Sequence, residues 1–257
     1  MSHAVRIFSH AISMVFRDFS ATVRATSAGI LLIAVGSALL IAVTPGLLSG
    51  VTTLPDPFVP SSDAESDINF ALIIPAFLLM AVGYLMMIAA WHRFVLLPPE
   101  RRGEGFTPSA GIVLGYLGRS ILLGLVLGLI AIPIFIPVGI VGAAAGEVVA
   151  SLVAIPLVAL LGWVFFRWSL ILPACTIGHK MKFSESWEAS RPLAGTIFGI
   201  MIILAVFDFA LNTVLSSILT DNIVSGLISV IVSLLYALVS ASILTTIYGI
   251  AVEGRDV

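Results

Sequence analysis

Charge is what this sequence has least of. Only 10% of its 257 residues are charged and 60% are hydrophobic, whereas soluble domains carry about 25% charged residues. Because so little polarity cannot cover a water-soluble globule of this size, the natural solvent of the chain is lipid. The net charge of −2 also gives no indication of a nucleic-acid partner, and we expect none.

Cysteine is nearly absent, and familiar catalytic motifs are missing. The single cysteine, Cys175, excludes an internal disulfide and a cysteine-based metal cluster, so we expect a structural thiol. The four histidines lack H-x-x-H or H-E-x-x-H spacing, and no G-x-S-x-G, P-loop or paired-carboxylate pattern occurs. The sequence therefore predicts a protein that is not an enzyme and has no metal site or cofactor.

Long apolar runs dominate what is present. A helix needs ~20 apolar residues to cross the ~30 Å hydrocarbon core of a bilayer. Six runs have this length, at residues 27–48, 70–92, 120–141, 148–172, 195–219 and 223–250. The first is longer than a signal-peptide core and no A-x-A site follows it, so we expect it to remain as a span. The runs predict an all-α, polytopic transmembrane helical bundle, with a single membrane domain over residues 1–257.

The six spans are expected to form three hairpins, in units of about 3–92, 107–172 and 184–250. Each hairpin is expected to follow a cytoplasmic interfacial helix. Residues 3–20 are amphipathic, which is typical of a helix lying in the headgroup layer or packed on the bundle ends. Their expected buried face holds Phe8, Ile12, Val15 and Phe19.

The other two interfacial helices are expected from capping signals. Thr107 reads as an N-cap with Pro108 at the first helical position, which predicts a short helix over 108–118 before the third span. Ser184 reads as the N-cap of the last unit, with Glu185 in the first turn, where a carboxylate suits the helix dipole.

The distribution of charge predicts the orientation. In the six-span arrangement all lysines and arginines fall on one face or at its border, and the opposite loops hold only acidic charges. Because basic residues mark the cytoplasmic side, we expect both termini in the cytoplasm. The basic residues are Arg6, Arg17, Arg24, Arg93, Arg101, Arg102, Arg119, Arg167, Lys180, Lys182, Arg191 and Arg255, and the acidic ones are Asp56, Asp63, Glu65, Asp67, Glu147 and Asp221.

Arg167 is a candidate interface contact together with Trp163 and Trp168. It lies inside an apolar run, a few residues from the cytoplasmic end of the fourth span. One interpretation is contact with a substrate or a lipid headgroup. The other is a structural side chain that reaches the nearby interface beside the tryptophans.

Asp208 lies midway along the fifth span, where a carboxylate costs about 2.5–3.5 kcal/mol to insert. It should therefore face the bundle interior, as a proton or cation site or as a hydrogen-bonded structural acid. We predict a polar seam between the fifth and sixth spans, because polar side chains recur every four residues on both and match in depth. The expected pairs are Asp208–Ser233, Asn212–Ser229 and Ser216–Ser225.

Glycine pairs four residues apart permit close contact between membrane helices. They occur at Gly46/Gly50, Gly111/Gly115, Gly124/Gly128 and Gly195/Gly199. In a chain with 22 glycines such pairs indicate packing and little else.

Several segments resemble known membrane proteins. They are WHRFVLL (91–97), GYLGRSILLG (115–124), LILPA (170–174), SESWEASR (184–191) and LTTIYGIAVEGR (244–255). These segments are similar to six-span inner-membrane proteins of alphaproteobacteria and, more loosely, to the membrane domain fused to some glycerophosphodiester phosphodiesterases. The resemblance implies a helical fold and a bacterial inner-membrane location. It implies no phosphodiesterase activity, because that chemistry belongs to a separate barrel domain.

Three functions remain open on the sequence. The favoured hypothesis is a non-enzymatic inner-membrane protein that binds membrane lipids, a membrane-protein partner or a second copy of itself. The alternative is a small transporter or permease with Asp208 as a proton-linked site. A membrane enzyme is the least supported, because no base or nucleophile accompanies the buried carboxylate at matching depth.

Overall fold

The computed structural model describes residues 2–43, 70–98, 100, 107–220 and 223–256, and every regular element within them is a helix. The all-α prediction is confirmed, and six of the helices are long and apolar enough to cross a membrane. The loop over 49–69, Arg101, Arg102 and Asp221 lie outside the described residues. The helices are α1 (His3–Phe16), α2 (Phe19–Val43), α3 (Phe70–Leu96), α4 (Ala110–Ala145), α5 (Glu147–Trp168), α6 (Ile171–Thr176), α7 (Phe183–Ala189), η3 (Arg191–Leu193), α8 (Ala194–Ile218) and α9 (Ile223–Glu253).

The chain turns between α1 and α2 at Asp18. Its Oδ1 accepts a hydrogen bond of 3.0 Å from the backbone N–H of Ala21, in the first turn of α2. This bond caps the helix, and together with Ser20 it lowers the pKa of the Asp18 carboxyl. The amphipathic pattern over 3–20 therefore contains a helix end, and the first apolar helix starts eight residues earlier than the predicted span.

Helix α1 packs against both α8 and α9. Its buried face is Ala4, Ile7, Ala11 and Val15, and Phe8 meets Phe207 of α8 with ring centroids 5.7 Å apart. The amphipathic face thus covers other helices. Phe19 was expected to be buried in lipid or protein; its ring is not covered by protein, since it lies half exposed and stacks on Phe16 at the α1–α2 corner.

Helices α2 and α3 pack against each other along their length. The contact is closest at Gly29 and Gly83: a Cβ added to either would lie 2.5–2.7 Å from the carbonyl oxygen of the other. Gly36 makes a similar approach to Ala76. The absence of side chains here allows the two backbones to touch, as in other close membrane-helix pairs.

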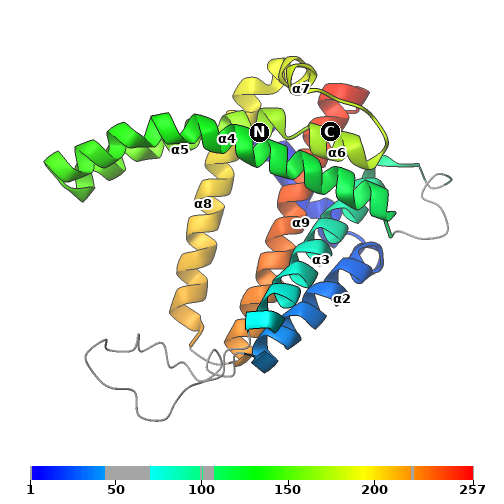
Figure 1. The fold of residues 1–257 in the computed structure, drawn as a ribbon. Coiled ribbons are helices and arrows are strands. Elements are labelled where there is room, and N and C mark those ends of the chain that lie inside the picture. The colour runs from blue at the N-terminus through cyan, green and yellow to red at the C-terminus, as the bar shows by residue number, and fades with distance from the viewer. Residues whose placement is uncertain (1, 44–69, 99, 101–106, 221–222, 257) are drawn as a thin grey trace, which may run out of the picture.

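Helices α4 and α5 lie side by side and run across one end of the bundle, extending well beyond it (Figure 1). The predicted separate helix over 108–118 does not form, because α4 is continuous from Ala110 with Ser109 as N-cap. Thr107 is therefore not the cap. Gly146 separates α4 from α5. Its φ of 89° is a backbone conformation that residues other than glycine adopt only at a cost in free energy.

The last two long helices do not form the expected close hairpin. Helix α8 packs mainly against α1 and α5, while α9 packs mainly against α1 and α3. The ribbons of α8 and α9 stand apart in Figure 1, and the rings of Phe207 and Tyr236 stack between them. Ahead of them α7 begins after Lys182 rather than Ser184. The Glu185 carboxylate accepts a 2.9 Å hydrogen bond from the Lys182 N–H, so its predicted place in the first turn is confirmed.

Candidate functional site

Most buried polar side chains gather at one end of the bundle. We call it the polar end: it contains the last turns of α3, α5 and α9 together with α6, α7 and η3. Its fully or almost fully buried polar residues are His92, Arg167, Ser169, Thr176, Ser186, Ser190, Ser242, Thr245 and Thr246. This end is therefore the candidate site.

A hydrogen-bonded seam joins α3 to α9. Trp91 Nε1 donates to Ser242 Oγ at 2.8 Å, and His92 Nδ1 lies 2.6 Å from Thr245 Oγ1. Because the Thr245 hydroxyl donates its only proton to the Ala241 carbonyl, we assign the imidazole proton to Nδ1. Nε2 is then a buried acceptor, and it is the single buried side-chain nitrogen or oxygen of the described residues that lacks a hydrogen-bond partner.

Two further contacts hold the segment after α5 against this seam. Arg93 Nη1 donates to the Thr176 carbonyl at 2.6 Å, and His179 Nδ1 lies 2.8 Å from the Tyr248 hydroxyl. The thiol of Cys175 is half-buried in the same segment and donates to the Leu172 carbonyl at 3.1 Å.

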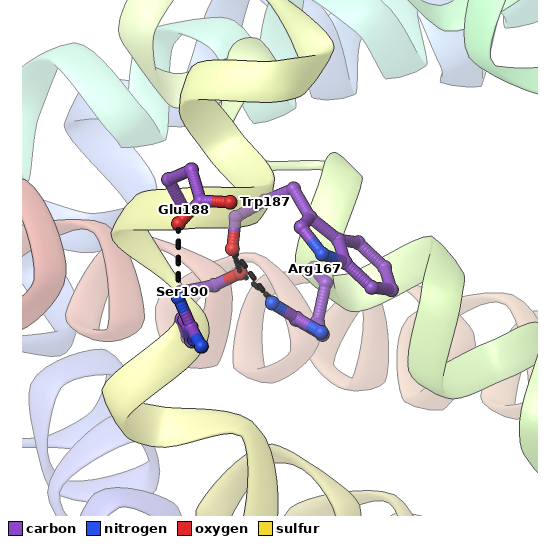
Figure 2. Close-up of polar contacts among 5 residues, drawn as sticks. Arg167, Trp187, Glu188 and Ser190 are labelled. Atoms are coloured by element: carbon purple, nitrogen blue, oxygen red, sulfur yellow. Dashed lines mark hydrogen bonds and ion pairs between the residues drawn. The ribbon is translucent and has the colours of Figure 1, made fainter.

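Arg167 is the centre of a second cluster, shown in Figure 2. Its Nε donates to Ser190 Oγ at 3.1 Å and its Nη2 to the Trp187 carbonyl at 2.6 Å. The guanidinium carbon lies 3.4 Å from the centroid of the Trp187 ring and 4.8 Å from that of Trp163. In return, the Ser186 hydroxyl donates to the Arg167 carbonyl. The end of α5 is thus fixed to α7 and η3.

Three tryptophans surround this arginine. The Trp163 ring meets the Trp187 ring edge-on at 5.5 Å, and Trp168 lies 6.0 Å from Trp187. Trp163 Nε1 also donates to the Ala194 carbonyl at 2.8 Å. These aromatic contacts give a cation a low-dielectric surrounding with negative ring faces.

The structure brings Arg167, Trp163 and Trp168 into one cluster, in which Trp187 covers most of the Arg167 side chain. Only 4% of the residue is exposed, because the segment after α5 folds back as α7 and places Trp187 over the guanidinium. Trp187 was missing from the sequence-based site. The signal that could have found it is the aromatic residue in the first turn of the helix predicted to begin at Ser184.

The polar seam predicted between α8 and α9 does not form. The Asn212 amide donates to the carbonyl of Asp208 and the Ser216 hydroxyl to that of Thr213, both within α8. Ser225 Oγ accepts from the Thr220 N–H, and no hydrogen bond joins Asp208 to Ser233 or Asn212 to Ser229 in the described part of the chain. The contact at this depth is the stacked pair Phe207–Tyr236, 6.2 Å between centroids. The predicted depth register was therefore close: Phe207 stacks on Tyr236, and Asp208 lies near enough to interact electrostatically with the same side chain, without a hydrogen bond to Ser233.

The polar end offers hydrogen bonding and cation–aromatic contact. Among the described residues, no group of three or more His, Cys, Asp or Glu side chains could hold a metal ion. Comparison with protein-family models, curated proteins and solved structures finds no match to the chain. Its function has to be inferred from its own geometry.

Proposed function

We propose that this multi-pass membrane protein acts without catalysis, by binding membrane lipids or a membrane-protein partner. The observation that supports the proposal is the pair α4–α5. It extends beyond the rest of the bundle (Figure 1), and large apolar side chains project from it along its length. Such an unpacked apolar surface is typical of contact with lipid or with another membrane helix.

The glycines of α4 support the same interpretation. A Cβ added to Gly124 or Gly128 would meet no atom within 4 Å, whereas one added to Gly29 or Gly83 would clash with the backbone of a neighbouring helix. Glycines thus allow α2 and α3 to pack closely, whereas the face of α4 that holds Gly124 and Gly128 has no helix packed against it. No described contact of Asp208 favours proton-coupled transport over binding.

We further propose the bacterial inner membrane as the location, with both termini in the cytoplasm. The support is the one-sided placement of basic residues in the sequence and the resemblance described above. On this orientation the polar end faces the cytoplasm, because it holds Lys180, Lys182 and Arg255.

Site-specific photocrosslinking in native membranes tests the binding proposal. A photoreactive residue at Leu129 of α4 or Leu152 of α5 should give a defined lipid or protein adduct. Leu31 of α2 is the matched control, since its exposed fraction of 65% is close to the 69% and 66% of the test positions. Equal, diffuse labelling at all three positions, with nothing retained when the protein is extracted in native nanodiscs, would contradict the proposal.

A further inference from the structure

Arg167 makes no ion pair within 4 Å among the described residues, although Glu188 lies near enough to interact with it electrostatically. Glu188, labelled in Figure 2, pairs instead with Arg191 at 3.7 Å. A buried charge is costly unless an opposite charge and hydrogen bonds accompany it. The hydrogen bonds to Ser190 and Trp187 hold the guanidinium in place but supply no negative charge, and the carboxylate that acts on it, Glu188, is exposed and paired with Arg191.

One end of the guanidinium is available for an anion. Nε and Nη2 are engaged, and Nη1 makes no hydrogen bond within the described residues. His92 Nε2 is the sole side-chain atom of that set that is both sealed from solvent and unpaired, so Nη1 is not completely sealed, although only 4% of the residue is exposed. Its two N–H groups are strong donors to phosphate oxygens.

The surroundings of Arg167 fit a phosphate at the membrane surface. Trp163, Trp168 and Trp187 form the kind of aromatic group found at headgroup depth. Arg191 lies near enough to interact electrostatically with Arg167, and its side chain is 78% exposed. Because its partner Glu188 is also exposed, an incoming anion can compete for Arg191 at little cost.

We propose that Arg167 and Arg191 bind a phosphate group, carried by an anionic phospholipid headgroup or present as free phosphate. The inference rests on the proposed binding function and names the chemistry of one ligand. Arg167 would contact the phosphate through Nη1, with Trp187 fixing the guanidinium plane, and Arg191 would add a second cation from the exposed side.

The test is lipid retention in phosphatidylcholine nanodiscs titrated with phosphatidylglycerol, read by native mass spectrometry. Wild type should retain phosphatidylglycerol in preference to phosphatidylcholine. Arg167→Lys keeps the charge and loses the guanidinium fork, so retention should fall about tenfold, as for loss of a charge-assisted hydrogen bond. Because this variant can also disturb folding, Arg191→Gln is the second variant, and it should weaken retention severalfold. Lys180→Gln, an equal loss of charge at another exposed position, should behave as wild type.

Inorganic phosphate distinguishes the two sources. If free phosphate at millimolar concentration raises the melting temperature of wild type but not of Arg191→Gln, and displaces the lipid, the site takes phosphate itself. If phosphatidylglycerol raises the melting temperature of wild type and free phosphate does not, the site takes a lipid headgroup. Equal retention by wild type, Arg167→Lys and Arg191→Gln, or no preference for phosphatidylglycerol, would overturn the inference. Adducts at Leu129 or Leu152 would still support the binding function in that case.

Discussion

Replacing Gly83 by alanine should separate α2 from α3 and destabilise the protein. The added methyl group would lie 2.7 Å from the Gly29 carbonyl oxygen and 2.8 Å from the Ile33 nitrogen. Both atoms belong to the backbone, so no side-chain rotation can relieve the contact. Ordinary contact begins at 3.4 Å, so the two helices would have to move apart by about 0.7 Å.

The magnitude follows from close packing. Inserting a methyl group into a well-packed contact typically costs about 1–3 kcal/mol. The upper part of this range is expected here, because a rigid-body shift weakens the dispersion contacts along the whole α2–α3 interface. Gly29→Ala should cost a similar amount, since its Cβ would approach Gly83 and Met87 equally closely.

Thermal unfolding in detergent micelles, followed by circular dichroism, measures the effect. Gly128→Ala is the control, because the same methyl group on α4 would meet nothing within 4 Å and should leave the melting temperature unchanged. If Gly83→Ala melts with wild type, or if Gly128→Ala melts as low as Gly83→Ala, then the close α2–α3 contact does not limit stability and the reasoning is refuted.

Three further outcomes are expected. In a double-mutant cycle of Trp91→Phe and Ser242→Ala, the coupling free energy from thermal unfolding should be about 0.6 kcal/mol, the average for hydrogen bonds within membranes, and a value of zero would mean that this 2.8 Å bond does not stabilise the fold. Asp18→Asn should match wild type at neutral pH, because asparagine caps helices equally well, but should lose the acid sensitivity of wild type. The folded pKa of Asp18 is lowered, chiefly by the backbone N–H that it caps, so its stabilisation is complete above the ordinary pKa of 3.8 and is lost as pH falls through the lower folded pKa. Melting curves above and below pH 3.8 that show the same acid sensitivity in both proteins would contradict this assignment. Finally, an impermeant thiol reagent on the periplasmic side should label a cysteine at Ser62, which lies outside the described residues, and not one at Lys182; the reverse pattern would invert the proposed topology.

The all-α class of fold could be predicted because it depends on the length of the apolar runs. An apolar run of about 20 residues is typical of a membrane-spanning helix and of few other structures. Helix ends could be predicted less well. Residues 108–118 and the third span are one helix, since neither Gly118 nor Arg119 stops an α-helix and the Arg119 guanidinium donates to the Gly115 carbonyl one turn back. The end at Phe16 was missed because an aspartate cap inside an amphipathic pattern looks like one more polar residue.

Which faces meet could not be predicted, because spacing does not say which helices are neighbours. The Asp208–Ser233 pairing assumed that α8 packs directly on α9, whereas α1 contacts both. Glycine spacing was equally uninformative. The pair Gly124/Gly128 has the four-residue spacing, but no neighbouring helix lies close to it. Gly29 and Gly83 make the close contact, although they are 54 residues apart in sequence. Arg167 was found because charge in an apolar run is rare, but its partner Trp187 comes from a later helix.

The position of α1 has a consequence for how the protein is made. Its apolar face is covered by α8 and α9, and α8 begins 178 residues after α1 ends. At the ~5–20 residues per second of protein synthesis, α1 emerges from the ribosome roughly 10–35 s before these helices exist. During that interval Ile7, Ala11 and Val15 must be sheltered by lipid, the insertion machinery or a chaperone. A nascent chain halted before α8 would leave this face of α1 without its protein neighbours. Exposure of the face would therefore distinguish an unfinished chain from the complete protein.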